Sequence, residues 1–316
     1  MKSDRLFLVA ALLVMGAGWG ATIPISKYYV TQGLQPFGVL FWQLLIGALL
    51  LGSYTLVQGK KLPLTRRHLA LYTFVGLAGT LIPGFFSMLS MKYLPAGIMA
   101  LIMSSVPMLV FPIALLMGQD TFSWKRFFGL ALGLVAVGFI VAPEASLPER
   151  AMVAFIPLAL IGPFCYAIEA NVVAKVGTLG VGPIRVLLGA FTIGTILALP
   201  LALLTGQWIS PFEPMGWPHF AVVFSAVIHA VVYGGYVWLV GRAGSVFAAQ
   251  VAYLVTGFGL LWSILFLNET YSVYIWLALS LMFVGVFLVQ PRAKPALEQT
   301  APLVKDGATR IRSANL

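Results

Sequence analysis

Long apolar runs follow one another along the chain, separated by short segments that contain polar residues, glycine or proline. The hydrocarbon core of a membrane is about 30 Å thick, and a helix needs roughly 20 apolar residues to cross it at about 1.5 Å per residue. Runs of this length recur ten times. The pattern predicts an all-α integral membrane protein with ten transmembrane helices, at residues 6–30, 37–58, 68–90, 95–117, 125–142, 151–175, 182–205, 218–241, 244–267 and 272–290.

The segments between these runs are too short to bury a hydrophobic core of their own. Residues 291–316 are polar and poor in aromatic side chains, which is typical of a disordered tail. The charged start at residues 1–5 resembles that of a signal peptide. However, the apolar run that follows continues through Tyr29 without a clean small-x-small cleavage site, so we expect a retained first helix.

Composition and charge agree with this interpretation. Of the 316 residues, 60% are hydrophobic and only 9% are charged, which excludes a water-soluble domain. The net charge of +10 could indicate nucleic acid, but all of the 19 cations except Lys27, Lys92 and Arg150 fall in segments that lie on one side of a ten-helix protein. This is the asymmetry of the positive-inside rule. It predicts two cytoplasmic termini and no nucleic-acid partner.

Motifs of catalysis and cofactor binding do not occur in the sequence. Cys165 is the single cysteine, so no disulfide can form within the chain. A dinucleotide fingerprint, a P-loop, a zinc-ligand cluster and a G-x-S-x-G elbow are missing. We therefore expect neither a cofactor, a metal ion nor catalytic residues. The sequence leaves the oligomeric state open, and a monomer is plausible.

The chain also resembles itself. Short stretches match at shifts of 147 to 149 residues: W19-G-A-T22 with Y166-A-I-E169, A96-G-I-M-A100 with S245-V-F-A-A249, and D120-T-F-S123 with E269-T-Y-S272. An odd number of helices per repeat inverts the second copy in the membrane. We therefore predict a first five-helix repeat at 1–145, a second, inverted repeat at 146–290, and a cytoplasmic tail at 291–316.

Several local features point to a known family. They are Trp19-Gly20 in the first span, Pro107 within the fourth, and an acidic residue that closes the fourth and ninth spans. With these features, residues 6–290 resemble the drug/metabolite transporter superfamily in its EamA-type, ten-helix form. The resemblance implies an inner-membrane carrier, usually an exporter of small metabolites such as amino acids. It also implies a central cavity lined by helices 1, 3, 4, 6, 8 and 9.

Two positions depart from that family pattern. Gln119-Asp120 stands where Gly-Glu is usual, and Thr256-Gly257 stands where the family often has proline. These departures leave the expected fold unchanged and weaken any transfer of gating detail.

Polar positions within the spans predict the transport pathway, because polar groups that face lipid are costly. The span at 218–241 carries three such residues at i, i+4 and i+7, on one face of a helix. These are His229, Tyr233 and Tyr236, and their repeat counterparts in the span at 68–90 are Thr80, Gly84 and Ser87. The two matched stripes predict two walls that face each other.

The first and sixth spans carry a second matched pair of stripes. Trp19 and Thr22 share a face of the first span, and their repeat counterparts in the sixth are Tyr166 and Glu169. We expect these four side chains to face the pathway as well.

The fourth and ninth spans add Ser104 and its repeat counterpart Tyr253. Both lie about 13–17 Å from the predicted span ends, as does His229, and this depth is close to the membrane midplane. Carriers with inverted repeats bind their substrates there. Pro107, beside Ser104, is the predicted hinge. The predicted substrate-binding residues are Trp19, Thr22, Thr80, Gly84, Ser104, Tyr166, Glu169, His229, Tyr233 and Tyr253.

Glu169 is the only acid well inside a predicted span. A charge there costs a few kcal/mol unless it is solvated or paired. Such a carboxyl group could bind a proton or a substrate ammonium, with His229 as a proton partner deeper in the path. Alternatively, Glu169 reaches the cytoplasmic interface, because Lys175 and the predicted helix end are only about 9 Å away.

Other polar positions have structural alternatives. Small residues and Ser/Thr in these helices can serve helix packing alone, and Lys27 can extend to the interface. His229 can be a hydrogen-bonded core histidine. Packing rather than lining is equally open for four aromatic residues: Trp19, Tyr166, Tyr233 and Tyr253. Four tryptophans near span ends fit an interfacial belt: Trp124, Trp208, Trp217 and Trp276.

The sequence thus predicts a secondary transporter that moves a small amphipathic metabolite, such as an amino acid or a related compound, by alternating access. The expected partners are a small-molecule substrate and membrane lipid, and the driving force is either the substrate's own gradient or protons. The alternatives are a lipid flippase of the same superfamily, which would need Arg or Lys in the cavity, and an intramembrane enzyme, which would need a nucleophile and base at one depth.

Overall fold

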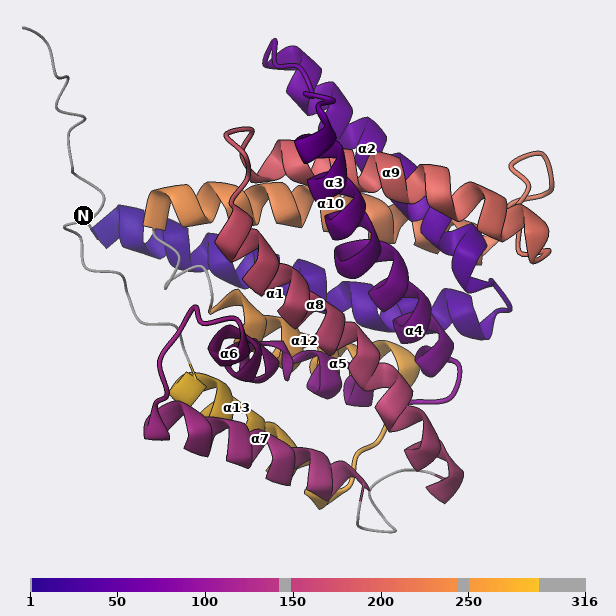
Figure 1. The fold of residues 1–316 in the computed structure, drawn as a ribbon. Coiled ribbons are helices and arrows are strands. Elements are labelled where there is room, and N and C mark those ends of the chain that lie inside the picture. Colours follow the sequence, from indigo (N-terminus) through magenta and orange to yellow (C-terminus); the bar gives the residue numbers. More distant parts are fainter. Residues whose placement is uncertain (1, 142–148, 244–249, 290–316) are drawn as a thin grey trace, which may run out of the picture.

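The computed structural model describes residues 2–141, 149–243 and 250–289, and within these ranges all regular structure is helical (Figure 1). The elements are α1 (Lys2–Thr31), α2 (Pro36–Val57), α3 (Arg66–Gly76), η1 (Leu77–Leu81), α4 (Ile82–Met91), α5 (Ala96–Met103), α6 (Val106–Leu116), α7 (Trp124–Val141), η2 (Arg150–Phe155), α8 (Ile156–Val176), α9 (Pro183–Leu204), α10 (Trp217–Ala243), α12 (Val251–Leu267) and α13 (Val273–Val289). The all-α fold is confirmed for this part of the chain.

Helices occupy all ten predicted spans. Seven helical stretches in the described ranges are long and apolar enough to cross a membrane, and α12 and α13 are shorter apolar helices. The eighteen-residue helix α7 fills the remaining predicted span. Residues 244–249, which begin the predicted ninth span, and the predicted tail at 291–316 lie outside the described residues.

Two spans that the hydropathy pattern predicts as single helices are interrupted. The third contains η1, a π-helical turn that ends two residues before Pro83. The fourth breaks between α5 and α6, just before Pro107. Proline lacks the N–H that would bond to the carbonyl four residues earlier. A proline is therefore the sequence signal for both interruptions, although only Pro107 was predicted to be a hinge.

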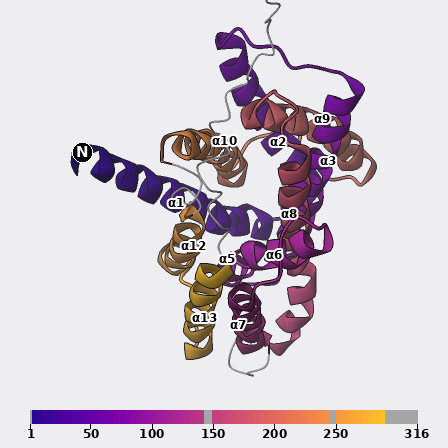
Figure 2. The same cartoon turned by 60° about the vertical axis from the view of Figure 1, so that its left-hand side comes forward.

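Contacts between the two halves come in matched pairs. Helix α1 of the first half packs on α10 and α12 of the second half. Helix α8, the counterpart of α1, packs in the same way on α4, α5 and α6 of the first half. Helix α3 packs on α9, and its counterpart α10 packs on α2. Figure 2 shows α2, α3 and α9 grouped at one end of the bundle and α7 and α13 side by side at the other, with α1 and α8 between them.

A close crossing of α1 and α12 holds Trp19 in place. A Cβ added at Gly20 would lie 2.9 Å from both the Gly259 nitrogen and the Phe258 Cβ. Only glycine permits this approach of the two backbones, as at many helix contacts in membranes. Gly20 therefore makes the contact with α12, whereas the side chain of the adjacent Trp19 points away from this crossing.

Candidate functional site

Aromatic side chains of α1 and α10 form one cluster, which consists of Trp19, His229, Tyr233 and Tyr236. The centroid of the Trp19 ring lies 5.8 Å from that of His229, 6.5 Å from that of Tyr233 and 5.7 Å from that of Tyr236. The predicted stripe of α10 thus meets the predicted stripe of α1. Three members of this aromatic cluster, Trp19, His229 and Tyr233, are predicted binding residues.

A hydrogen bond fixes the orientation of the imidazole. The Trp19 Nε1–H donates to His229 Nδ1 over 3.2 Å. Because indole is a donor only, Nδ1 must be the acceptor and the neutral ring carries its proton on Nε2. His229 is also exposed, on the face of α10 opposite Val231. Its Nε2–H is therefore the group it can offer to a ligand.

The carboxylate of Glu169 lies against the π-helical turn η1. A Cβ added at Gly79 would lie 2.9 Å from Glu169 Cδ and 3.1 and 3.2 Å from its two oxygens. The missing side chain of Gly79 therefore makes room for the acid. The sequence carries no signal for Gly79, because its role depends on a residue in another helix.

Tyr166 precedes Glu169 by three residues on α8, so the two side chains share one face of that helix. Within the described ranges, the carboxylate has no hydrogen-bond donor and no cation paired with it. Glu169 is thus a half-buried acid that a cation or a proton would neutralise.

The counterparts predicted in the third span face other neighbours. The Thr80 hydroxyl donates to the Gly76 carbonyl and lies 3.4 Å from a Cβ position added at Gly194 of α9. A Cβ added at Gly84 would meet Leu40 of α2 at 2.6 Å. Both contacts fit the alternative that small residues in these spans serve helix packing. A role of Thr80 and Gly84 in lining the pathway stays a prediction.

Ser104 lies at the break between α5 and α6. It is buried, and its hydroxyl donates to the Leu101 carbonyl over 2.7 Å. Pro107 stands at the start of α6, directly after the break. The interruption is present where the proline predicts it, while movement about it stays a prediction.

Two further predicted residues, Thr22 and Tyr253, contact their own helix and a neighbouring helix, respectively. The Thr22 hydroxyl donates to the Trp19 carbonyl of the same helix over 2.7 Å. The ring of Tyr253 lies 5.8 Å from that of Phe283 on α13. Neither contact joins these residues to Glu169.

A buried amide on α8 was also missed. Asn171 donates to the carbonyl of Val110 on α6 over 3.1 Å and to the Ala167 carbonyl over 2.9 Å. It links the helix of Glu169 to the broken fourth span. A polar residue two positions after Glu169 was the available signal.

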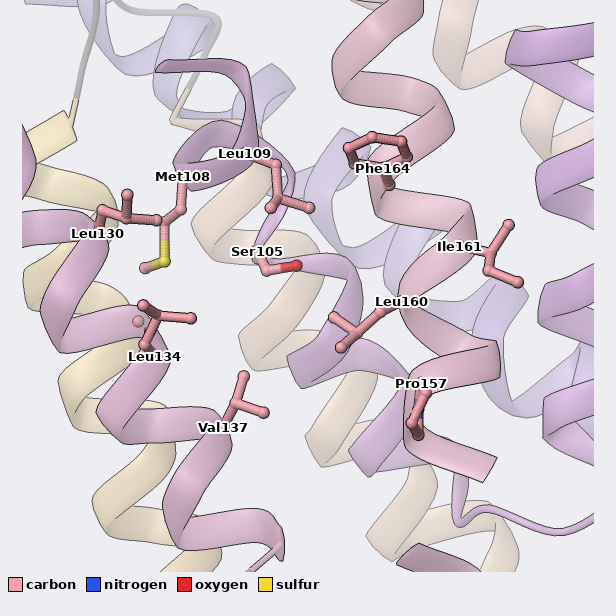
Figure 3. Close-up of a pocket in the computed structure, with 11 residues that line it drawn as sticks. Ser105, Met108, Leu109, Leu130, Leu134, Val137, Pro157, Leu160, Ile161 and Phe164 are labelled. Atoms are coloured by element: carbon pink, nitrogen blue, oxygen red, sulfur yellow. The ribbon is translucent and has the colours of Figure 1, made fainter. Parts of the chain in front are cut away.

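A separate apolar pocket lies between α6, α7 and α8 (Figure 3). Its volume is about 330 Å³, and Ser105 supplies the only hydroxyl of its lining, which donates to the Ile102 carbonyl. Leu134 and Phe164 of the lining are exposed. The pocket contains none of the predicted binding residues, and its lining suits hydrocarbon rather than a polar solute.

Helices of this length and apolarity define a multi-pass membrane protein. The EamA-like transporter family model matches residues 6–142 and 154–290, so the chain belongs to this family. It is a membrane transporter.

Known relatives agree with this assignment. The chain is 26% identical over 298 residues to the uncharacterized transporter YvbV of Bacillus subtilis, covering 93% of each chain. It is 24% identical to the uncharacterized inner membrane transporter YedA of Escherichia coli K12, covering 96% of this chain and 97% of YedA. A solved crystal structure matches with a TM-score of 0.62 at 15% identity and covers 89% of this chain and 96% of the other, which supports the fold.

Proposed function

We propose that this chain is a secondary carrier that moves a small amphipathic metabolite, an amino acid or a related amine, across the cytoplasmic membrane. Glu169 binds the ammonium group of the substrate or a proton in its place. The observation that carries this proposal is the Glu169 carboxylate, which lies against Gly79 without a donor or cation among the described residues. Export as the direction follows from the family resemblance.

The chemistry of the surroundings favours a cation. An acid within the membrane is costly unless it is paired or solvated, so it gains most from a ligand that brings positive charge. Aromatic faces such as those of Trp19, Tyr233 and Tyr236 attract ammonium groups by cation–π interactions, each worth about 0.5–2 kcal/mol. Apolar parts of the substrate would pack on the same rings.

Exchange at Glu169 provides a coupling mechanism. A carboxylate that holds either a proton or an ammonium, but not both, would link their movement in opposite directions. His229, whose Nε2–H is free of the bond to Trp19, is a second group that could donate to the substrate or pass a proton.

Alternating access would follow from two inverted repeats, at residues 1–145 and 146–290. The exchanged helix contacts between the halves and the family matches at 6–142 and 154–290 support this division. In such carriers one repeat rocks against the other around a site near the midplane. The positive-inside asymmetry supports cytoplasmic termini, and the name of YedA supports the inner membrane.

A lipid flippase is less well supported. A phosphate headgroup would call for a cation in the pathway, and within the ten predicted spans Lys27 is the one cation remote from the cytoplasmic ends. Its Nζ already donates to the carbonyls of Met91 over 2.6 Å and Leu94 over 3.0 Å. An intramembrane enzyme has no observation in its favour.

A transport screen tests the proposal. The purified protein is reconstituted in liposomes, and fluxes of labelled amino acids, amines, organic anions and a fluorescent phospholipid are compared with protein-free liposomes. Saturable flux of an amino acid or amine is expected. Flux of the phospholipid or an anion alone would overturn the proposed substrate class.

A further inference from the structure

A polar cluster joins the two halves of the chain at the start of α5. The Glu269 carboxylate, from the segment between α12 and α13, accepts the Ala96 N–H at 2.7 Å and the Gly97 N–H at 3.1 Å. The Tyr271 hydroxyl donates to the same carboxylate and accepts the Gly97 N–H at 3.0 Å. Glu269 and Tyr271 thus act as the N-terminal cap of a helix that belongs to the other half.

Helix α5 has no such cap of its own. Pro95 occupies the N-cap position and provides no side-chain hydrogen bond. The first N–H groups of a helix lack intrahelical partners, and the N-terminal end of the helix dipole attracts negative charge. A carboxylate that accepts two of these N–H groups makes strong, charge-assisted hydrogen bonds.

The fit between these groups is close. A Cβ added at Gly97 would lie 2.1 Å from the Tyr271 Oη, so no larger residue fits while the contact is made. Burial, and after it the adjacent Glu269 carboxylate, raise the pKa of the Tyr271 hydroxyl, which therefore stays protonated as a donor.

Lys27 of α1 completes the cluster. Its Nζ binds the carbonyls of Met91 and Leu94 at the end of α4, and its charge acts on Glu269. Lys27 therefore ties α1 to the turn that leads into α5, on the side of the cluster where Glu269 lies. The contacts of Glu269 thus depend on the outer ends of both halves being together.

The repeat counterpart of Glu269 has a different environment. Asp120, which aligns with Glu269, forms an ion pair with Arg126 and accepts the Thr121 N–H over 2.8 Å. Arg126 aligns with the apolar Ile275 in the second repeat. The first-half acid therefore has a cation on its own half, whereas Glu269 accepts backbone N–H groups of the opposite half.

We propose that Glu269, with Tyr271 and Lys27, is the external latch of the carrier, which holds the outer ends of the two halves together and favours the outward-closed state. This inference rests on the proposed alternating-access function and on the predicted topology, which places the start of α5 outside. Opening to the outside separates the carboxylate from the N–H groups of α5 and from Lys27. Because Asp120 keeps Arg126 in either state, the two sides of the carrier open with unequal ease.

The latch is tested by the accessibility of a cysteine at Thr22, on α1 and deeper than Lys27. In a Cys165→Ser, Thr22→Cys background, intact cells are treated with a membrane-impermeant thiol reagent. Glu269→Gln should raise the labelling rate about tenfold, the effect of losing one charge-assisted hydrogen bond. Glu213→Gln, the same change at an exposed acid of the predicted external segment between α9 and α10, should leave the rate unchanged.

Further variants keep the test decisive. Tyr271→Phe removes only the hydroxyl, so it should raise the rate in the same direction by a smaller factor, and it replaces Glu269→Gln if that protein is absent from the membrane. The latch would be overturned if both variants were labelled at the rate of the parent protein. It would also be overturned if labelling increased only from the cytoplasmic side, as measured in inverted vesicles. Flux of the substrate by the parent protein is measured separately, so a latch that fails leaves the proposed transport function standing.

Discussion

The carboxylate of Glu169 on α8 rests against the backbone of Gly79 in the π-helical turn η1, so that even a methyl group at Gly79 would lie 2.9 Å from its carboxyl carbon. Two residues ninety positions apart in the chain thus build one site. One supplies the charge, and the other supplies the space for it.

Gly79→Ala should impair transport. The added methyl group displaces the carboxylate, which is the end of a flexible side chain, so the change moves the acid rather than the backbone. We expect the rate of transport per folded protein to fall about tenfold, since about 1.4 kcal/mol corresponds to that factor. Gly138→Ala on α7 is the matched control, because an added Cβ there meets no atom within 4 Å. Equal transport by both variants would separate Gly79 from function.

The hydrogen bond between Trp19 and His229 should matter for transport more than for stability. Trp19→Phe removes one hydrogen bond, which is worth about 1 kcal/mol of unfolding free energy. Trp262→Phe removes a similar bond, from the Trp262 indole to the Ala17 carbonyl at 3.0 Å. Thermal unfolding should show comparable losses for the two, whereas only Trp19→Phe should lower flux. A comparable loss of flux in both variants would contradict a binding role for the aromatic cluster.

Cysteine labelling in the Cys165→Ser background tests which face of α10 lines the pathway. Cysteines at His229 and Tyr233 should react with a water-soluble thiol reagent, and substrate should protect them. A cysteine at Val231, which is 65% exposed on the opposite face of the helix, should stay inert because lipid covers it. Equal labelling at all three positions would mean that α10 is oriented differently.

The orientation in the membrane is tested by reporter fusions. Fusions after Lys61 and at the C-terminus should report the cytoplasm, and those near Ser146 and Gln207 should report the outside. An external C-terminus would contradict both the ten-helix topology and the inverted repeat.

The spans could be predicted from the sequence because the bilayer imposes a length on every apolar run. The face of each polar stripe could be predicted in part. The three side chains at i, i+4 and i+7 of α10 share one face and all contact Trp19, a neighbour that the matched stripes did not predict. The direction of Thr80 and Gly84 could not be predicted, since it depends on how α9 and α2 pack against an interrupted helix.

Gly79 and Glu269 show why the rest was out of reach. A glycine in a span has many uses, and this one has meaning only when Glu169 approaches from another helix. Glu269 could be recognised as a repeated acid at the end of a span. Its contact with α5 depends on tertiary structure that no spacing along the chain reveals.

Transport by Glu169→Gln tests the central claim most directly. The substitution keeps the shape of the side chain and removes its charge. With the protein in liposomes, flux should fall sharply, and any remaining flux should lose the pH dependence of the parent, while protein levels stay normal and Glu213→Gln behaves as the parent does. Parental flux with a parental pH profile in Glu169→Gln would contradict the account and place Glu169 at the membrane interface instead.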